Sequence, residues 1–487
     1  MRTPGGNTGA GAPRRRYRHA VLLVLMLVYA CNSAQRSLIP IIGQAMKLDL
    51  HLTDTELGLL TGTAFAALYA LAGLPVARLA ERCNRVGILA AALALWSCCT
   101  TLFALTGSFL QLLVARVGVG VGEAGCAPCA HSLISDYYPR ERRSSALSLY
   151  SCGLSLGYLW VGLLGAYVTQ HFGWRAACIA IGVPGIALAL LLRALIAEPA
   201  RGLADGGAGA APPAALRAEL AQLAATARAL FLRWPSANII AGLTLSSFAA
   251  YGSWAFIPAY FPRAFGLSYQ DAGLVLGLVG SIPVALGTLA GGLLSDWLGR
   301  RSARWYALVP AAGLLAATPC YLGALAQRDW QRAALLLALP GFFQYVSLAP
   351  SFGVVQNVVA VRQRATATAL LFLCLNVLAL GGGALFTGFL IDQLSQGYFA
   401  QPQLGAAGAL AGLLHAPGGP FGTLCPGGAA GAGAEAALVR RCAVALAHGS
   451  RAGIALTLTL HLWAAGHYLL AAAGLSAQLR RTAPVPA

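Results

Sequence analysis

The chain has 487 residues, of which 58% are hydrophobic and only 10% are charged. Soluble globular proteins carry about 25% charged residues, so this chain has too few to cover a surface that faces water. The composition excludes a soluble domain, a disordered chain and a coiled-coil fibre. Because the apolar stretches are continuous and do not alternate with polar residues, we expect an all-α polytopic membrane protein and not a β-barrel.

Basic residues outnumber acidic ones, with 33 Lys and Arg against 15 Asp and Glu and a net charge of +18. In a soluble protein this surplus would favour nucleic-acid binding. Here the basic residues lie between apolar stretches, which favours a topology signal over contact with nucleic acid. We expect a monomer in a lipid bilayer, with a small molecule as its partner.

Segments of about 20 apolar residues can each cross the hydrocarbon core of a membrane. Twelve such segments follow one another along the chain. The predicted spans are residues 19–46, 55–80, 86–106, 109–135, 144–170, 174–196, 236–262, 270–297, 303–325, 331–360, 364–392 and 449–475.

This order predicts two six-helix bundles. The predicted parts are a basic tail (1–18), the N-terminal bundle (19–196), a linker (197–235), the C-terminal bundle (236–475) and a C-terminal tail (476–487). Residues 214–233 of the linker have the pattern of an amphipathic helix on the membrane surface. Residues 393–448 are rich in Gly, Ala and Pro, and we expect an irregular outer loop there.

Arginine counts predict the orientation. The side of the two tails and the linker holds 23 of the 33 basic residues, and the opposite side holds 8. Cytoplasmic loops carry the excess, so we expect both termini in the cytoplasm and the protein in the cell (inner) membrane. Cys425 and Cys442 share the long outer loop, and we predict a disulfide between them there.

The two halves of the chain repeat each other. Glu81 and Arg85 recur 215 residues later as Asp296 and Arg300. Two related six-helix halves place the substrate site at their interface near the middle of the membrane. The repeat therefore favours a transporter over a receptor or a membrane enzyme.

The stretch from Gly292 to Arg301 reads G-L-L-S-D-W-L-G-R-R. It resembles the cytoplasmic loop signature of the major facilitator superfamily, and the counterpart around Glu81 and Arg85 is degenerate. The carboxylate of Asp296 can pair with arginines and cap a neighbouring helix, which would latch the cytoplasmic side. The gate residues would be Glu81, Arg85, Asp296, Arg300 and Arg301. The alternative is an arginine-rich loop that only anchors the topology.

An ionisable residue inside a membrane span is a candidate functional residue. The polar and charged side chains inside the first and fourth spans include Tyr29, Asn32, Gln35, Arg36, Arg116 and Glu123. The helical rise places Arg36 roughly 25 Å and Glu123 roughly 20 Å from the cytoplasmic side, with Arg116 roughly 30 Å away near the outer surface. Helices 1 and 4 both line the cavity in the superfamily fold that this chain resembles, so we expect an Arg36–Glu123 pair that faces water.

A second resemblance is to the Spinster branch of the superfamily. It is carried by R-V-G-V-G-V-G-E from Arg116 to Glu123, by D-Y-Y-P-R-E-R-R from Asp136 and by L-T-D-T-E-L-G-L-L from Leu52. The resemblance implies transport of lysolipids and sphingoid phosphates, often with protons. It also implies that Arg36 and Glu123 match the arginine of helix 1 and the glutamate of helix 4 in that branch.

The chain departs from the Spinster pattern next to Arg36. The family has an aspartate at the preceding position, where this chain has Gln35. A glutamine cannot titrate. Either Glu123 carries a proton alone, or transport is uncoupled facilitation.

The cavity helices of the C-terminal half offer aromatic and amide side chains, including Tyr251, Trp254 and Gln344, with no charge in their middle. Ordinary packing explains any one aromatic residue. Together with the charged N-terminal half, however, they suit an amphiphile that has one ionic head and an apolar tail.

The sequence therefore predicts a secondary transporter of small amphiphilic organic anions that works by alternating access. It lacks a P-loop and the common hydrolase motifs, so we expect no enzyme activity, no ATP-driven transport, no cofactor and no metal. Two alternatives remain at this point. One is efflux of drugs or metabolites, and the other is a non-transporting receptor or regulator, which the long segment 393–448 would favour.

Overall fold

A computed structural model describes residues 15–201, 203, 216–360, 363–414 and 419–482. Within these residues, eleven continuous helical stretches are long and apolar enough to cross a membrane. One of them, Ala146–Leu195, has 50 residues, but Gly173 interrupts its helical geometry with a φ of 85°. Since 50 residues rise by roughly 75 Å, this stretch makes two crossings. The prediction of an all-α protein with twelve spans is confirmed.

The N-terminal bundle contains the first six crossings, and the π-helical turns η1 and η3 lie within two of them. Its helices and π-turns are α1 (Arg15–Arg36), α2 (Leu38–Leu50), α3 (Asp54–Gly58), η1 (Leu59–Thr63), α4 (Ala64–Arg82), α5 (Arg85–Leu102), α6 (Phe109–Glu123), α7 (Cys126–Tyr137), α8 (Arg140–Trp160), η3 (Val161–Gly165) and α9 (Ala166–Leu195). Within this bundle α1 packs on α8, and α5 packs on α9 and α6.

The C-terminal bundle follows the helical linker segment α10 (Leu216–Phe231). Its elements are α11 (Trp234–Phe265), α12 (Tyr269–Gly299), α13 (Trp305–Leu325), α14 (Trp330–Tyr345), α15 (Leu348–Asn357), α16 (Arg364–Cys374), η6 (Leu375–Leu380), α17 (Gly381–Ala400) and α20 (Ala436–Thr482). The long helix α20 packs on α11, α13 and α17. Residues 1–14, 204–215 and 483–487, which belong to the predicted tails and linker, lie outside the described part.

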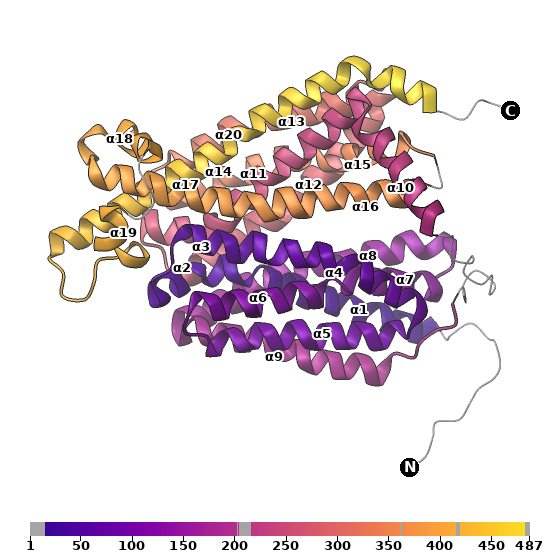
Figure 1. The fold of residues 1–487 in the computed structure, drawn as a ribbon, viewed down its shortest axis with the longest axis horizontal. Helices are drawn as coiled ribbons and strands as arrows, with labels where there is room; N and C mark the ends of the chain where they lie inside the picture. The colour runs from indigo at the N-terminus through magenta and orange to yellow at the C-terminus, as the bar shows by residue number, and fades with distance from the viewer. Residues whose placement is uncertain (1–14, 202, 204–215, 361–362, 415–418, 483–487) are drawn as a thin grey trace, which may run out of the picture.

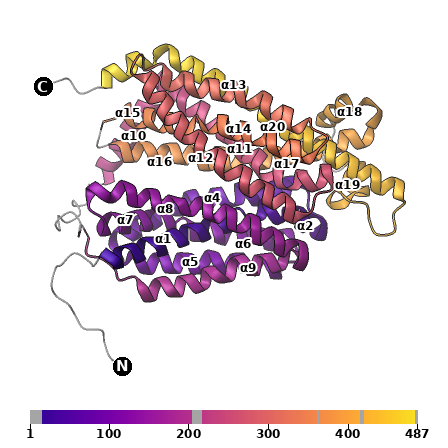
Figure 2. The same ribbon diagram turned by 180° about the vertical axis from the view of Figure 1, so that it is seen from behind.

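The two bundles form two layers that lie side by side along the length of the molecule (Figures 1 and 2). Helix α1 begins, α20 ends and α10 lies at one end, which we call the basic end. The opposite end carries the short helices α18 (Ala406–Ala411) and α19 (Pro420–Leu424), and we call it the insert end.

The predicted limits of the outer loop are wrong. Helix α17 continues to Ala400 and α20 begins at Ala436, so the connection covers residues 401–435, and its described residues include two short α-helices. The high content of Gly, Ala and Pro in residues 393–448 suggested an irregular loop. The alanines around Arg440 and Arg441 nevertheless keep the segment helical beyond the membrane. We call residues 401–435 the insert.

A disulfide closes the insert at the base of α20. It joins Cys425 to Cys442, whose Cα atoms are 5.7 Å apart. The guanidinium of Arg441 lies over the ring of Phe399 at 4.2 Å and donates to the carbonyl oxygen of that residue at 2.7 Å. The disulfide holds the insert against the beginning of α20, and Arg441 joins that helix to the end of α17.

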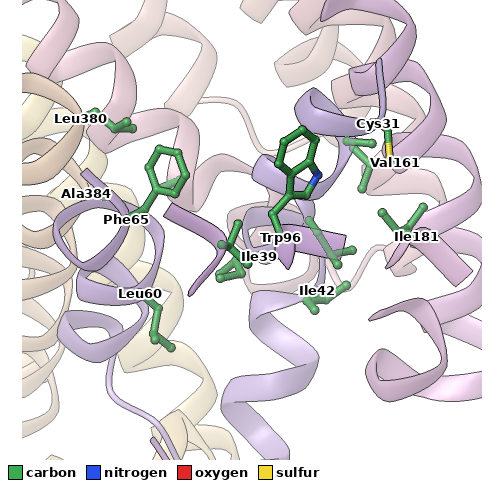
Figure 3. Close-up of a cluster of buried hydrophobic side chains, with 14 of the residues drawn as sticks. Cys31, Ile39, Ile42, Leu60, Phe65, Trp96, Val161, Ile181, Leu380 and Ala384 are labelled. Atoms are coloured by element: carbon green, nitrogen blue, oxygen red, sulfur yellow. The ribbon is translucent and has the colours of Figure 1, made fainter. Parts of the chain in front are cut away.

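Hydrogen bonds between described residues of the two bundles cluster in the half of the molecule near the insert end. The hydroxyl of Thr63 donates to the carbonyl oxygen of Gly381 at 2.6 Å. Figure 3 shows Leu60 and Phe65 of the N-terminal bundle beside Leu380 and Ala384 of the C-terminal bundle. All four side chains are buried. The bundles are therefore closed against each other toward the insert end.

Candidate functional site

The predicted ion pair of helices 1 and 4 is formed in the structure. The Nε and Nη2 atoms of Arg36 donate to Oε2 of Glu123 at 3.0 Å and 2.8 Å. The Glu123 side chain is fully buried, whereas 33% of the Arg36 side chain is exposed. Arg36 ends α1 and Glu123 ends α6, and both positions lie midway along their crossings. The partly exposed cation of Arg36 is thus paired with the buried carboxylate of Glu123.

Two aromatic rings surround the guanidinium of Arg36. Its Cζ atom lies 4.8 Å from the ring centroid of Phe65 and 5.4 Å from that of Tyr69. The guanidinium of Arg116 lies over the ring of Phe65 as well, at 5.0 Å. A ring face attracts a cation, so Phe65 helps two arginines to lie close together. The sequence analysis missed Phe65 and Tyr69, which the spacing of four residues on α4 places on the face toward Arg36.

Arg116 holds two interrupted helices together. Its Nη2 atom donates to the carbonyl oxygen of Arg36 at 3.3 Å, and its Nε atom donates to the carbonyl oxygen of Leu60 at 3.0 Å. Proline has no N–H, so Pro40 cannot supply the usual helical donor to the Arg36 carbonyl. In the π-turn η1, the N–H of Ala64 bonds to Leu59 in place of Leu60. Arg116 therefore satisfies carbonyl groups that lack their regular helical donors.

The glycines between Arg116 and Glu123 allow neighbouring helices to approach this site. A Cβ atom on Gly120 would lie 2.8 Å from the carbonyl oxygen of Phe65, and one on Gly122 would lie 2.9 Å from Cβ of Trp96. Small residues permit this close approach of helix backbones in membranes. The glycine-rich motif thus sets the distance at which α4 and α5 pack against the charged helix.

The structure separates Gln35 from the pair that it was predicted to accompany. Gln35 is 1% exposed and lies between α5 and α9, where its amide donates to Ser97 at 3.1 Å and accepts from Thr100 at 2.9 Å. Successive helical residues are turned by about 100°, so Gln35 points away from the side of α1 that carries Arg36. Asn32 is also buried.

Tyr29 has a different environment from Gln35. It lies seven residues, close to two helical turns, before Arg36 and is only partly buried. Its ring stacks on Tyr150 of α8 with centroids 4.7 Å apart. Tyr29 therefore remains on the side of α1 that carries the charged pair.

The three predicted residues of the C-terminal wall have three environments. Tyr251 is 42% exposed, and Trp254 lines a small cavity between the bundles together with Ser37 and Tyr158. Gln344 is buried inside the C-terminal bundle, where it accepts a hydrogen bond of 2.6 Å from the hydroxyl of Tyr321. Tyr251 and Trp254 are at least partly exposed in this conformation, whereas Gln344 is already engaged by its own bundle.

Among the predicted gate residues whose side chains the structure describes, the contacts at the basic end lie within one bundle. Asp296 accepts a hydrogen bond of 2.8 Å from the hydroxyl of Tyr306, and the guanidinium of Arg301 lies over Trp297 at 5.3 Å. Arg300 is exposed. Each of these contacts stays within the C-terminal bundle.

The N-terminal counterpart of that gate is an internal ion pair. Arg85 is buried and pairs with Asp136 and with Glu198, whose carboxylate lies 2.6 Å from Nε. The side chain of Glu81 lies outside the described part of the structure. Arg85 therefore joins α5, α7 and the segment after α9 within one bundle.

A group of buried charges near the insert end was missed by the sequence analysis. Lys47, Asp54 and Arg263 have side chains no more than 2% exposed. Asp54 pairs with both cations, and Asp392 of α17 accepts hydrogen bonds from the start of α3. Arg263 and Asp392 lie 209 and 338 residues from Asp54 in the sequence, and only Asp392, an unexplained aspartate within an apolar run, could have indicated such a group.

Two helical bundles that enclose an Arg–Glu pair define a membrane transporter of the major facilitator type. The family model of the Major Facilitator Superfamily matches residues 25–383. The chain is 33% identical over 390 residues to an MFS-type efflux pump of Mycolicibacterium smegmatis, covering 80% of this chain and 87% of the relative. The chain belongs to the major facilitator superfamily.

The comparisons also point to one branch of that superfamily. A crystal structure of a bacterial homolog of the human lysosomal transporter Spinster, inward-facing and unoccupied, matches with a TM-score of 0.80 and 29% identity. The match covers 97% of this chain and 100% of that structure. The protein spinster homolog 1 of Xenopus tropicalis is 26% identical over 406 residues, 78% of this chain and 74% of the relative. The predicted Spinster-like relationship is confirmed.

Proposed function

We propose that the protein is a secondary transporter that carries amphiphilic organic anions of the lysolipid type by alternating access. The observation that carries this proposal is the Arg36–Glu123 pair, in which the cation is one-third exposed and the carboxylate is fully buried. An anionic head group can bind the exposed side of the guanidinium, while the aromatic and apolar walls around it suit an acyl chain. The matches relate the chain to Spinster-type proteins, and the resemblance described in the sequence analysis implies this substrate class.

Glu123 is the proposed coupling residue. An anion that binds Arg36 competes with Glu123 for the same guanidinium, and a buried carboxylate that loses its cation is unfavourable. A proton on Glu123 removes that cost, because the neutral acid no longer needs the cation. Anion and proton would then occupy the site together, and transport would move both in the same direction. The distribution of the arginines supports an orientation in which the basic end faces the cytoplasm, with the protein in the inner membrane of the cell.

Efflux of drugs or other metabolites is the second candidate. The 33% identity to a mycobacterial efflux pump supports it, and an exposed Arg36 would serve any organic anion. A panel of fluorescent lysolipids, fatty acids and dyes, tested for export from cells that express the protein, separates the two. Saturable transport of lysolipids that the dyes do not inhibit supports the first candidate.

The test is uptake of a fluorescent lysolipid into proteoliposomes, with and without an imposed proton gradient. For Glu123→Gln we expect the gradient to have no effect, while exchange without a gradient persists. Asp329→Asn is the matched control, because Asp329 only caps α14 by accepting from the N–H of Arg332 at 3.1 Å, and asparagine caps a helix equally well. Wild-type rate and pH dependence in Glu123→Gln would exclude Glu123 as the coupling residue.

A further inference from the structure

Four charged residues join the two bundles near the insert end. Lys47 of α2 and Asp54 of α3 belong to the N-terminal bundle, whereas Arg263 of α11 and Asp392 of α17 belong to the C-terminal bundle. The group has no net charge. Since Lys47, Asp54 and Arg263 are almost completely buried, each charge depends on the others for its partners.

Asp54 is the centre of the group. One oxygen of its carboxylate accepts from Lys47, and the other accepts from Nη2 of Arg263 at 2.6 Å. Arg263 reaches across the interface and also donates to the amide oxygen of Gln44 at 2.6 Å, while Nη1 donates to Ser450 of its own bundle at 2.9 Å. A fork-shaped guanidinium with three different acceptors fixes the distance between the bundles.

Asp392 makes the second connection by capping a helix of the opposite bundle. Its carboxylate accepts from the N–H of Asp54 at 3.0 Å, and from the N–H and hydroxyl of Thr55 at 2.7 Å and 2.6 Å. A capping box between Thr53 and Glu56 already satisfies two other N–H groups at the start of α3. Asp392 thus supplies acceptors that α3 does not provide itself, and its charge matches the positive end of the helix.

The backbones leave no space between the bundles beside these charges. A Cβ atom on Gly388, four residues before Asp392, would lie 2.1 Å from the carbonyl oxygen of Asp54. The insert covers the same junction, since a Cβ atom on Gly427 would lie 2.9 Å from the carbonyl oxygen of Lys47. Any separation of the bundles here has to break the contacts of Arg263 and Asp392.

We infer that Arg263 and Asp392 form, with Asp54 and Lys47, a latch that keeps the insert end closed, and that this latch releases each time the transporter opens there. The inference rests on the proposed alternating access. Opening leaves Lys47 and Asp54 together as a neutral pair in the N-terminal bundle. Variants of Arg263 and Asp392 therefore weaken the latch without leaving an unpaired charge on that bundle.

The test measures the distance between the bundles directly. Gly107 and Arg328 are exposed turn residues at the insert end, one on each bundle, and a Cβ atom on Gly107 would meet no neighbour within 4 Å. Each would be replaced by a noncanonical amino acid that accepts a spin label, because the exposed Cys83, Cys98 and Cys152 would otherwise react. Pulsed electron paramagnetic resonance then reports short and long distances as closed and open populations.

For Asp392→Ala and Arg263→Gln we expect the open population to rise about tenfold, because each loses charged hydrogen bonds of the closed state alone. Asp49→Asn is the matched control, because Asp49 pairs with Arg175 within the N-terminal bundle and on the surface, and its distances should equal those of the wild type. Asp392→Asn keeps the size of the side chain and should give a smaller rise in the same direction. It decides the matter if Asp392→Ala does not fold.

Wild-type distances in folded Arg263→Gln and Asp392→Asn would overturn the latch. This readout is independent of transport. If the variants open but no lysolipid is carried by the wild type, the latch stands and the proposed substrate is wrong. If lysolipid is carried while the variants stay closed, the proposed function stands and the latch is wrong.

Discussion

The guanidinium of Arg36 donates twice to one oxygen of Glu123, and the other oxygen of that carboxylate is buried without a hydrogen-bond partner among the described residues. Buried polar atoms are usually satisfied. The free Oε1 atom is therefore a place where a proton, a water molecule or a donor of the substrate can bind. Arg36 keeps one side toward solvent, so each partner of the pair retains an unoccupied hydrogen-bonding position.

The stability of the pair can be measured by a double-mutant cycle. Arg36→Ala leaves the buried carboxylate of Glu123 without its cation. Loss of one partner of a buried pair lowers the free energy of unfolding by about 3–5 kcal/mol. Since Arg36 is partly exposed, we expect it to fall by about 2 kcal/mol in this variant. The double variant with Glu123→Gln should regain most of the loss, as judged by thermal unfolding in detergent. Equal melting temperatures for Arg36→Ala and the double variant would contradict this account.

Arg116 is expected to be a structural requirement of the site. Arg116→Ala removes the donors to the carbonyls of Arg36 and Leu60. Hydrogen bonds from charged groups contribute roughly 1.5–3 kcal/mol each to stability. We therefore expect Arg116→Ala to lower the free energy of unfolding by about 3 kcal/mol. Pro40→Ala restores an N–H that can bond to the Arg36 carbonyl, and it should reduce the effect of Arg116→Ala. Strict additivity of the two changes in unfolding free energy would show that Arg116 does not act through this carbonyl.

Gln35 should not tolerate an acid of its own size. Its amide nitrogen donates to the carbonyl oxygen of Ile181 at 3.3 Å, and a carboxylate would place two acceptors there. We expect Gln35→Glu to lose about 2 kcal/mol of unfolding free energy and to leave the response of uptake to a proton gradient unchanged. Gln35→Met is the control for size. A new proton dependence in Gln35→Glu would show that this position can reach the transport site.

The fold and the central pair could be predicted from the sequence, because both follow from one-dimensional patterns. Apolar runs of membrane length give the spans, and an unexplained charge inside a span indicates a site. The turn of about 100° between successive helical residues separates Gln35 from Arg36. The partners of Gln35 on α5 could not be predicted, however, because Ser97 and Thr100 lie 62 and 65 residues away in the sequence. The contact of Asp392 with Asp54 spans 338 residues. Such contacts depend on how the two bundles meet, which no local spacing encodes.

Two glycines that face different surroundings should respond oppositely to alanine. A Cβ atom on Gly58 would lie 2.3 Å from the backbone carbonyl oxygen of Ala384, whereas one on Gly73 would meet nothing within 4 Å. Overpacking costs about 1–3 kcal/mol, so Gly58→Ala should destabilise the closed insert end. Gly73→Ala should stabilise its helix by about 0.5–1 kcal/mol. Melting temperatures that move in the same direction for both would show that the helix contact is not tight at Gly58.

The disulfide between Cys425 and Cys442 should protect the insert more than the bundles. Phe421 lies in the insert with only 6% of its surface exposed, and its ring packs on Phe399 with centroids 5.7 Å apart. Closing a loop as long as the one between Cys425 and Cys442 stabilises the folded state by roughly 3 kcal/mol. In the double variant Cys425→Ser and Cys442→Ser, chymotrypsin should cleave after Phe421 much faster, while the melting temperature of the bundles changes little. Equal cleavage of wild type and variant would show that packing on α17 and α20 holds the insert without the covalent bond.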